Sequence, residues 1–405
     1  MDAASSAAVG WSGSLLSRPK PFEKPPGLRD YLPAQAVKLK NLESRLLDCM
    51  RRWGYRPIIT PTLEYYDTVG AASATSEAKL FKLLGQNGTT IVLRPEMTAP
   101  IARVAATLLR NEPLPLRLAY HANVFRAFGG EAGKDPEFWQ TGVELIGDAT
   151  PDADAEVIAL AAACLETAGV RSFALAIGHA GFLHAMLADV LRDRPQAQEE
   201  LKSCLSRRDF AGFRERLDGY GLPSDVRGEL ESMLRMRGGR DICDAVSGLS
   251  GHPEARQALE QLGELWEALQ AFGAADRVRI DLTLTGDFTY YTGMTFEGYA
   301  DGVGFPIASG GRYDRLLAQF GRPAPATGFA LKTNRILELV DDVGTPEPER
   351  VLVVYAPHRR QEALQKAAEL RRSGTCAVET MRTDVAAAAG VGPESSAAAR
   401  ILWLD

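Results

Sequence analysis

The chain has 405 residues, of which 45% are hydrophobic and 24% are charged, as in an ordinary globular protein. Its 46 Lys and Arg against 52 Asp and Glu give a formal net charge of −6, which excludes a global attraction for polyanions such as nucleic acid. The length allows two or three domains, each large enough for its own core.

The cysteines, the histidines and the N-terminal residues argue against three further classes of protein. The five cysteines are scattered without a C-x-x-C pair, and the five histidines form no H-E-x-x-H motif, which argues against a disulfide framework and a metal site. Residues 1–20 lack an apolar segment after a basic start, so no secretory signal is expected. The sequence contains no stretch of about 20 apolar residues, so no membrane span is expected. We therefore expect a cytoplasmic protein.

The first segments predict an arm, a helix and a strand. Residues 1–24 contain small residues followed by prolines, and we expect them to form a mobile arm. Apolar residues at helical spacing predict a helix over 36–53, which Gly54 ends. The next residues, 56–60, are expected to form a strand.

The middle of the chain predicts alternating strands and helices before a long helical region. Strands are expected over 89–93, 116–125 and 138–147, and helices over 100–110 and 152–169. Residues 129–134 form a glycine-rich turn between two of these strands and do not match a P-loop. Residues 183–275 are rich in Leu, Arg, Glu and Ala and predict an all-helical insertion.

Strand patterns return after the insertion. They cover 278–284, 290–299 and 304–308, and a helix follows over 333–340. Residues 345–349 are expected to form a linker. The last part of the chain predicts a small β-α-β…β module with elements over 351–355, 361–372, 376–380 and 401–404.

These elements indicate an α+β protein, in which an antiparallel sheet is flanked by helices. Turns rather than crossover helices join most of the core strands, which argues against a doubly wound parallel sheet. We expect four parts, namely the arm (1–24), the core (25–182 and 276–342), the helical insertion (183–275) and a short C-terminal α/β module (350–405).

One predicted strand combines polar and charged residues with a glycine. Over residues 137–144, alternation places Gln140 and Glu144 on one face, with Gly142 between them. The missing side chain at Gly142 leaves room for a ligand, although a solvated sheet face explains this run equally well. No G-x-S-x-G or EF-hand pattern proposes a catalytic nucleophile or a metal ligand.

Seven segments together resemble the catalytic domain of class II histidyl-tRNA synthetases, over about residues 20–340. They are the opening motif 26–33 (PGLRDYLP), 54–61 (GYRPIITP, similar to motif 1, a dimer-interface element), 93–98 (LRPEMT), 124–140 (similar to motif 2), the histidine-specific signatures 290–293 (YYTG) and 310–314 (GGRYD), and 328–335 (similar to motif 3). The resemblance implies the class II aminoacyl-tRNA synthetase fold.

The chain departs from the synthetase pattern at residues that serve adenylation. Phe128 replaces the Glu of motif 2, and Asn334 replaces the Glu before the arginine of motif 3. Residues 285–289 (TGDFT) lack the arginine that, in the synthetases, faces the carboxylate and the α-phosphate. A preorganised cation for the developing negative charge is therefore missing. The C-terminal module resembles only part of the anticodon-binding domain.

A synthetase-like chain that keeps histidine-site residues but loses adenylation residues resembles the regulatory subunits of ATP phosphoribosyltransferase. The resemblance implies a cytoplasmic hetero-octamer that contains a dimer of this chain and binds neither tRNA nor a membrane. In it, this chain would have no catalytic residues and no cofactor. It would activate the short catalytic subunit in the first step of histidine biosynthesis and help carry feedback inhibition by histidine.

The resemblance also implies a histidine pocket, carried over position by position. Glu96, Thr98 and Gln140 would contact the α-amino group, and Glu144 and Tyr291 would contact the imidazole. The residues that would line the rest of the site are Arg126, Tyr290 and Tyr313. A carboxylate pairs well with an ammonium, and a second carboxylate can accept an imidazole N–H.

Two alternatives remain open from the sequence. The first is an active but divergent histidyl-tRNA synthetase, against which the missing arginine and the short C-terminal module argue. The second is a stand-alone histidine-binding sensor without an enzyme partner, which nothing in the sequence excludes.

Overall fold

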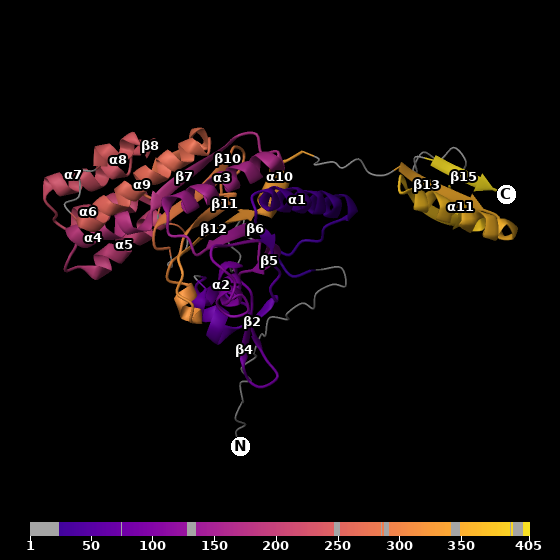
Figure 1. The fold of residues 1–405 in the computed structure, drawn as a ribbon, viewed down its shortest axis with the longest axis horizontal. Coiled ribbons are helices and arrows are strands. Elements are labelled where there is room, and N and C mark those ends of the chain that lie inside the picture. Colours follow the sequence, from indigo (N-terminus) through magenta and orange to yellow (C-terminus); the bar gives the residue numbers. More distant parts are fainter. Residues whose placement is uncertain are drawn as a thin grey trace, which may run out of the picture. The chain divides into compact units, whose positions relative to one another are not determined.

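The computed structural model describes residues 24–73, 75–127, 135–246, 252–284, 286, 291–341, 349–388, 390–391 and 400–405. The chain divides into two compact units, Met1–Val343 and Gly344–Asp405, which are described separately below (Figure 1). Several features expected from the sequence lie outside the described residues. They are nearly all of the arm, Phe128, the glycine-rich turn 129–134, most of the segment 285–289, Tyr290 and most of the linker.

The first unit is built on a nine-stranded sheet with the order β1-β5-β6-β12-β11-β10-β7-β9-β8. Its strands are β1 (Arg56–Pro57), β5 (Leu116–Phe125), β6 (Glu137–Ile146), β7 (Phe173–His179), β8 (Arg237–Gly238), β9 (Val278–Asp281), β10 (Met294–Ala300), β11 (Ala308–Arg312) and β12 (Ala326–Lys332). Neighbouring strands are antiparallel except for the pairs β1–β5 and β7–β9. The expected antiparallel α+β core is therefore confirmed.

The two faces of this sheet carry different helices. Helices α1 (Pro33–Arg52) and α3 (Pro151–Ala168) cover the face that carries Val143 and Leu145, and they share one large apolar core with it. Helix α2 (Thr98–Ala106) belongs to a second apolar cluster, together with Leu118 and Tyr120 of β5. The alternation expected for β6 is thus confirmed, because Gln140 and Glu144 lie on the α2 face.

Local sequence signals explain the ends of the long helices. Helices α1, α3 and α9 (Pro253–Ala271) each begin with proline, whose fixed φ and missing N–H suit the first helical turn. The hydroxyl of Thr150 accepts a hydrogen bond from the Ala153 amide at 3.4 Å and so caps α3. Gly169 ends this helix with a φ of +96°, a left-handed conformation that favours glycine.

The helices of the predicted insertion gather around the β7–β9–β8 end of the sheet (Figure 1). They are α4 (Ala180–Val190), α5 (Pro195–Ser206), α6 (Phe210–Gly219), α7 (Ser224–Met233), α8 (Asp241–Val246) and α9. The expectation of an all-helical segment is wrong at β8, which pairs with β9 of the main sheet. The Arg237 guanidinium supports this pairing by donating to Asp281 at 2.8 Å.

Several strand expectations need correction. Pairing of β1 stops after Pro57, so the strand expected over 56–60 is only two residues long. The strand expected over 304–308 lies instead at β11, and the longer strands β7 and β12 were not expected at all. Both of these strands are rich in Gly and Ala, which are depleted in strands.

Smaller elements complete the first unit. A second antiparallel sheet, with the order β2-β4-β3, is formed by β2 (Leu63–Tyr65), β3 (Lys82–Leu84) and β4 (Thr90–Leu93). Helix α10 (Thr333–Leu339) follows β12. Short helical turns lie at Tyr66–Gly70, Glu77–Lys79, Ala275–Arg277 and Leu317–Phe320.

The second unit is a three-stranded parallel sheet with the order β14-β13-β15. Its elements are β13 (Glu349–Tyr355), a short turn (Pro357–Arg359), α11 (Arg360–Ser373), β14 (Cys376–Arg382), α12 (Thr383–Ala388) and β15 (Arg400–Leu404). Helices α11 and α12 belong to two separate apolar clusters, which lie on opposite faces of β13. No helix in the described part of either unit is long and apolar enough to cross a membrane.

Candidate ligand pocket

A small pocket lies on the α2 face of the main sheet. It is lined by six of the residues expected from the sequence, namely Glu96, Thr98, Gln140, Glu144, Tyr291 and Tyr313. They come from the start of α2, from β6 and from the two segments that flank β10 and β11. Segments that are far apart in the sequence therefore meet where β6, β12 and β11 run side by side.

Glu144 is the most enclosed carboxyl group of the pocket, with only 1% of the residue exposed. One carboxyl oxygen accepts a hydrogen bond from the Thr98 hydroxyl at 2.8 Å, and the other accepts one from the Tyr313 hydroxyl. Burial raises the pKa of Glu144 to about 8, although both hydroxyl donors act in the opposite direction. A positively charged ligand would favour the ionised form.

Glu96 lies beside Glu144 and faces the start of α2. Its carboxylate accepts hydrogen bonds from the backbone amides of Thr98 and Ala99, the latter at 3.1 Å. These amides are unpaired within the helix and point toward its N-terminus, where negative charge is favourable. Burial still raises the pKa of Glu96, against the lowering effect of these amides and of the Arg126 charge.

Gln140 lies on the same face of β6 as Glu144 and is 2% exposed. In the described part of the chain its side-chain amide makes no hydrogen bond, so this amide can donate to a ligand and accept from it. The pocket therefore offers two carboxyl groups and one amide within a short stretch of the sheet.

Arg126 does not line the pocket, in contrast to its expected place. Its guanidinium donates to the Pro95 carbonyl at 2.7 Å and lies 5.5 Å from the centre of the Phe138 ring. It therefore supports the segment that carries Glu96 from behind. The side chain lies there because its positively charged guanidinium is attracted by the Pro95 carbonyl oxygen and by the face of the Phe138 ring.

The space expected at Gly142 is filled by protein. A Cβ atom at this position would lie 2.0 Å from the Phe329 carbonyl oxygen and 2.6 Å from the Tyr120 hydroxyl. Glycine is required here because the β12 backbone and the Tyr120 ring approach so closely, and these atoms leave no room for a ligand. The expectation that Gly142 leaves room for a ligand is therefore wrong.

Two lining residues, Tyr120 and Ser309, lie outside all seven synthetase-like segments and were missed from the sequence. Tyr120 pairs directly with Gly142 across β5 and β6, and an aromatic residue opposite a strand glycine is a known packing arrangement. That pairing was available from the predicted hairpin and could have indicated Tyr120. Ser309 had no such signal, because β11 was expected four residues too early.

Two polar residues of the motif 3-like segment, Asn334 and Arg335, lie outside the pocket lining, whereas Gly328, Phe329 and Ala330 belong to it. The Asn334 side chain accepts a hydrogen bond from the Trp139 amide and donates to the Tyr31 hydroxyl, at 2.8 and 2.9 Å. The Arg335 guanidinium donates to the Pro306 carbonyl at 2.6 Å and lies over the Phe305 ring. Both side chains are thus engaged by other parts of the first unit.

The lining of the pocket is acidic in composition. Among the described residues that line it there are two carboxyl groups and no Lys or Arg. Within the same described residues no group of three or more His, Cys, Asp or Glu side chains could hold a metal ion. The arrangement suits a small ligand that presents a positive charge and further N–H donors.

Comparisons with known proteins agree on one family. A family model described as histidyl-tRNA synthetase matches residues 27–336. A protein of Bacillus licheniformis named ATP phosphoribosyltransferase regulatory subunit is 45% identical over 354 residues, which cover 87% of this chain and 90% of that protein. A protein of the same name from Shouchella clausii is 41% identical and covers 96% of this chain and 98% of its own length. The chain belongs to the family of ATP phosphoribosyltransferase regulatory subunits.

Solved structures support the same assignment. A crystal structure from Bacillus halodurans C, described as an ATP phosphoribosyltransferase regulatory subunit/histidyl-tRNA synthetase, is similar with a TM-score of 0.85 and 41% identity. The match covers 96% of this chain and 99% of that one. A histidyl-tRNA synthetase from Nostoc sp. PCC 7120 has a TM-score of 0.74 at 20% identity, covers 89% and 85% of the two chains, and supports the fold alone. The expected class II synthetase-like fold is confirmed.

Proposed function

We propose that this chain is the regulatory, non-catalytic subunit of an ATP phosphoribosyltransferase and acts in the first step of histidine biosynthesis. The observation that carries the proposal is the family membership, which extends over nearly the whole length of relatives that bear this name. The partner is the catalytic subunit of the same enzyme. This chain then changes the activity of that partner by binding its active state more tightly than its inactive state.

The acidic lining of the pocket supports the non-catalytic part of this proposal. Transfer of a nucleotidyl or phosphoryl group requires cations that are aimed at the phosphate oxygens. The described lining supplies carboxyl groups instead, and the Arg335 guanidinium is engaged by the Pro306 carbonyl. Histidine-dependent exchange of labelled pyrophosphate into ATP should be absent, and robust exchange would favour the divergent synthetase instead.

Histidine is the proposed effector, and the pocket is its proposed site. Glu96, Thr98 and Gln140 would bind the α-amino group, and Glu144 and Tyr291 would bind the imidazole, with Tyr313 holding the Glu144 carboxyl group. Arg126 would act from behind through Glu96, and Tyr290 remains part of the proposed set. Because the pocket holds a buried carboxyl group for the imidazole N–H, analogues that lack this donor should be rejected.

The assembly is proposed to be a hetero-octamer that contains a dimer of this chain, is cytoplasmic and does not bind tRNA. Exposed apolar side chains on the motif 1-like segment and on the small sheet β2-β4-β3 support self-association. Contact of such a patch with water is unfavourable, and an interface would bury it. Among these side chains, Ile59 is 94% exposed and Leu84 is 84% exposed.

The test is reconstitution of the enzyme from its two purified subunits. The short catalytic subunit should have low ATP phosphoribosyltransferase activity alone and higher activity after addition of this chain. A catalytic subunit whose rate is unchanged by this chain would refute the regulatory role and favour the stand-alone sensor. Calorimetry with histidine on the wild-type chain and on Glu144→Gln tests the proposed site separately, because equal binding by both would place histidine elsewhere.

A further inference from the structure

The two histidine-specific signatures contain polar residues that do not line the pocket, namely Thr292, Arg312 and Asp314. Each of them is the immediate neighbour of a pocket tyrosine. Thr292 follows Tyr291, while Arg312 and Asp314 flank Tyr313. Strand alternation directs neighbouring side chains to opposite faces, so Arg312 lies behind the pocket on the α3 face, where Asp154 lies.

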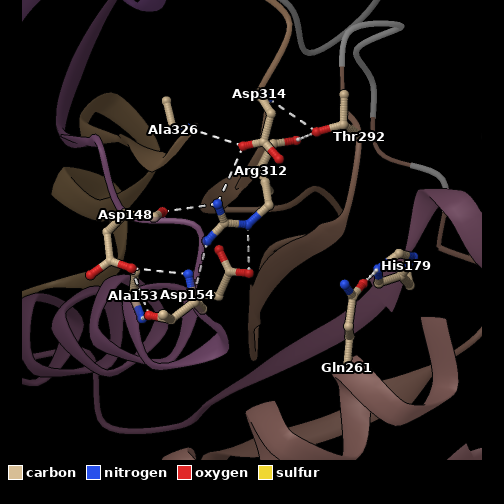
Figure 2. A network of polar contacts seen from close by, with 10 residues as sticks. Asp148, Ala153, Asp154, His179, Gln261, Thr292, Arg312, Asp314 and Ala326 are labelled. Atoms are coloured by element: carbon tan, nitrogen blue, oxygen red, sulfur yellow. Dashed lines mark hydrogen bonds and ion pairs between the residues drawn. The ribbon is translucent and has the colours of Figure 1, made fainter. Parts of the chain in front are cut away.

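Arg312 is buried and uses its whole guanidinium group. Its Nε donates to the Asp154 carboxylate at 3.0 Å, and its two terminal nitrogens donate to the carbonyls of Asp148 and Thr150, both at 3.0 Å. One terminal nitrogen also reaches the Asp314 carboxylate at 3.2 Å. Figure 2 shows the Arg312 side chain between Asp148, Asp154 and Asp314. The end of β11 is thereby fixed to the first turn of α3.

The same network continues to Thr292. Its hydroxyl accepts a hydrogen bond from the Asp314 amide at 3.1 Å (Figure 2). Its own amide donates to the Arg312 carbonyl at 2.8 Å. The Asp314 carboxylate in turn accepts from the Ala326 amide at 3.0 Å. The segment 312–314 is thus held on three sides, by α3, by β12 and by the segment that carries Tyr291.

Both pocket tyrosines depend on this segment for their position. The hydroxyl of Tyr313 reaches Glu144 from between the two anchored residues. The ring of Tyr291 packs on Gly311, because a Cβ atom there would lie 3.0 Å from two carbons of that ring. A shift of the β11 end would therefore move both rings relative to Glu144.

We propose that Arg312, together with Asp154, Asp314 and Thr292, is a positioning residue that sets the two pocket tyrosines against Glu144. Lysine cannot replace it, because one ammonium group cannot reach two carboxylates and two carbonyls in the planar arrangement of a guanidinium. The inference rests on the proposed function only for the identity of the ligand, since the placement of Tyr313 can be measured without one.

The test compares variants that disturb the network with variants that do not. Arg312→Lys removes the guanidinium group. Thr292→Val removes the hydroxyl group but keeps the shape of the side chain. Thr292→Ser keeps the hydroxyl. Arg117→Lys is the matched control, because Arg117 also pairs with α3, through Glu156 at 2.8 and 2.6 Å, but contacts neither tyrosine segment.

The first readout is the NMR resonance of Tyr313 in the full chain labelled with 13C at the ring carbon that bears the hydroxyl, assigned with Tyr313→Phe. It should move in Arg312→Lys and Thr292→Val and stay in place in Thr292→Ser and Arg117→Lys. An unmoved resonance in both disturbing variants would overturn the inference, whether or not the chain binds histidine. If Arg312→Lys fails to fold, Thr292→Val alone decides.

The second readout is histidine affinity by calorimetry. Arg312→Lys should weaken binding by about tenfold or more, because small displacements of binding groups have large effects, while Arg117→Lys should leave it unchanged. The loss should shrink in a Tyr313→Phe background, since the two residues act through one contact. Full additivity of the two substitutions would contradict the inference, whereas a wild-type chain that does not bind histidine would refute the proposed ligand alone.

Discussion

Glu144 carries a proton at a pH where an exposed glutamate has lost it. Burial raises the pKa of Glu144 to about 8, against about 4.3 in an unfolded chain. Between these values the folded state binds more protons than the unfolded state, so this residue lowers the free energy of unfolding as the pH rises. Glutamine at this position does not ionise, so it does not lower the free energy of unfolding as the pH rises.

We predict that the free energy of unfolding of the wild type falls relative to Glu144→Gln between about pH 5 and pH 8. The slope of the difference should be up to about 1.4 kcal/mol per pH unit. Denaturant unfolding across this range measures it. Glu215→Gln, at an exposed position of α6, is the control and should follow the wild type. Parallel curves for the wild type and Glu144→Gln would contradict the burial argument.

Individual residues of the pocket were predictable where a motif and strand alternation agreed. Gln140 and Glu144 share a face because β6 is regular, and Glu96 and Thr98 join them because the chain turns into α2 between them. The place of Arg126 was not predictable, since a long side chain chooses among several partners in three dimensions. Tyr290 lies outside the described residues and remains part of the proposal.

At the scale of elements, the pairing of β6 with β12 depends on Gly142. The Phe329 carbonyl that a Cβ atom would strike at 2.0 Å belongs to the backbone of the neighbouring strand and cannot rotate away. We predict that Gly142→Ala lowers the free energy of unfolding by about 1–3 kcal/mol and weakens ligand binding at the adjacent Gln140 and Glu144.

The control for this prediction is a glycine with free space around it. Apart from its chain neighbours and the backbone of its own helix, nothing in the described part of the chain lies within 4 Å of a Cβ atom built at Gly228, which is inside α7. Gly228→Ala should stabilise the protein by up to about 1 kcal/mol, because alanine is the better helix former. Thermal or denaturant unfolding measures both variants, and a Gly142→Ala protein as stable as the wild type would show that the strands can separate without cost.

Elements were predictable from the sequence where the local pattern was strong. Strands β5 and β6 match their expected ranges within one residue, and along β5 the burial of the side chains alternates over much of the strand. Strands β7 and β12 were missed because their small residues have a low strand propensity. These residues are needed for close tertiary contacts, which the local sequence does not reveal. Gly178 and Gly328 both lie against backbone atoms that would meet a Cβ atom at 2.8 Å or less.

At the scale of the whole molecule, the described core residues fall into separate groups. The two large clusters contain residues of the first unit only, including Leu262 of α9 beside sheet residues such as Val143. The two small clusters contain residues of the second unit only. The helices of the 183–275 segment should therefore unfold together with the sheet, and the unit 344–405 should unfold independently.

We predict two thermal transitions for the full chain and one for a chain that ends at residue 343. Leu262→Ala removes a fully buried side chain and should lower the free energy of unfolding of the first unit by about 2–5 kcal/mol, with no effect on the second transition. Calorimetry distinguishes the two units. A separate transition for the 183–275 segment would contradict the shared core.

The central claim is that histidine acts on the partner enzyme through the pocket of this chain. The most direct measurement is histidine inhibition of ATP phosphoribosyltransferase activity in the reconstituted complex, with wild-type chain, Glu144→Gln or Glu215→Gln. Linkage requires that a ligand which shifts the complex toward its inactive state bind that state more tightly.

The account predicts that the Glu144→Gln complex keeps its activity without histidine but needs about tenfold or more histidine for the same inhibition, because a charge-assisted hydrogen bond is lost. The Glu215→Gln complex should match the wild type. Identical inhibition curves for all three complexes, or a catalytic subunit that is fully active and equally inhibited without this chain, would contradict the claim.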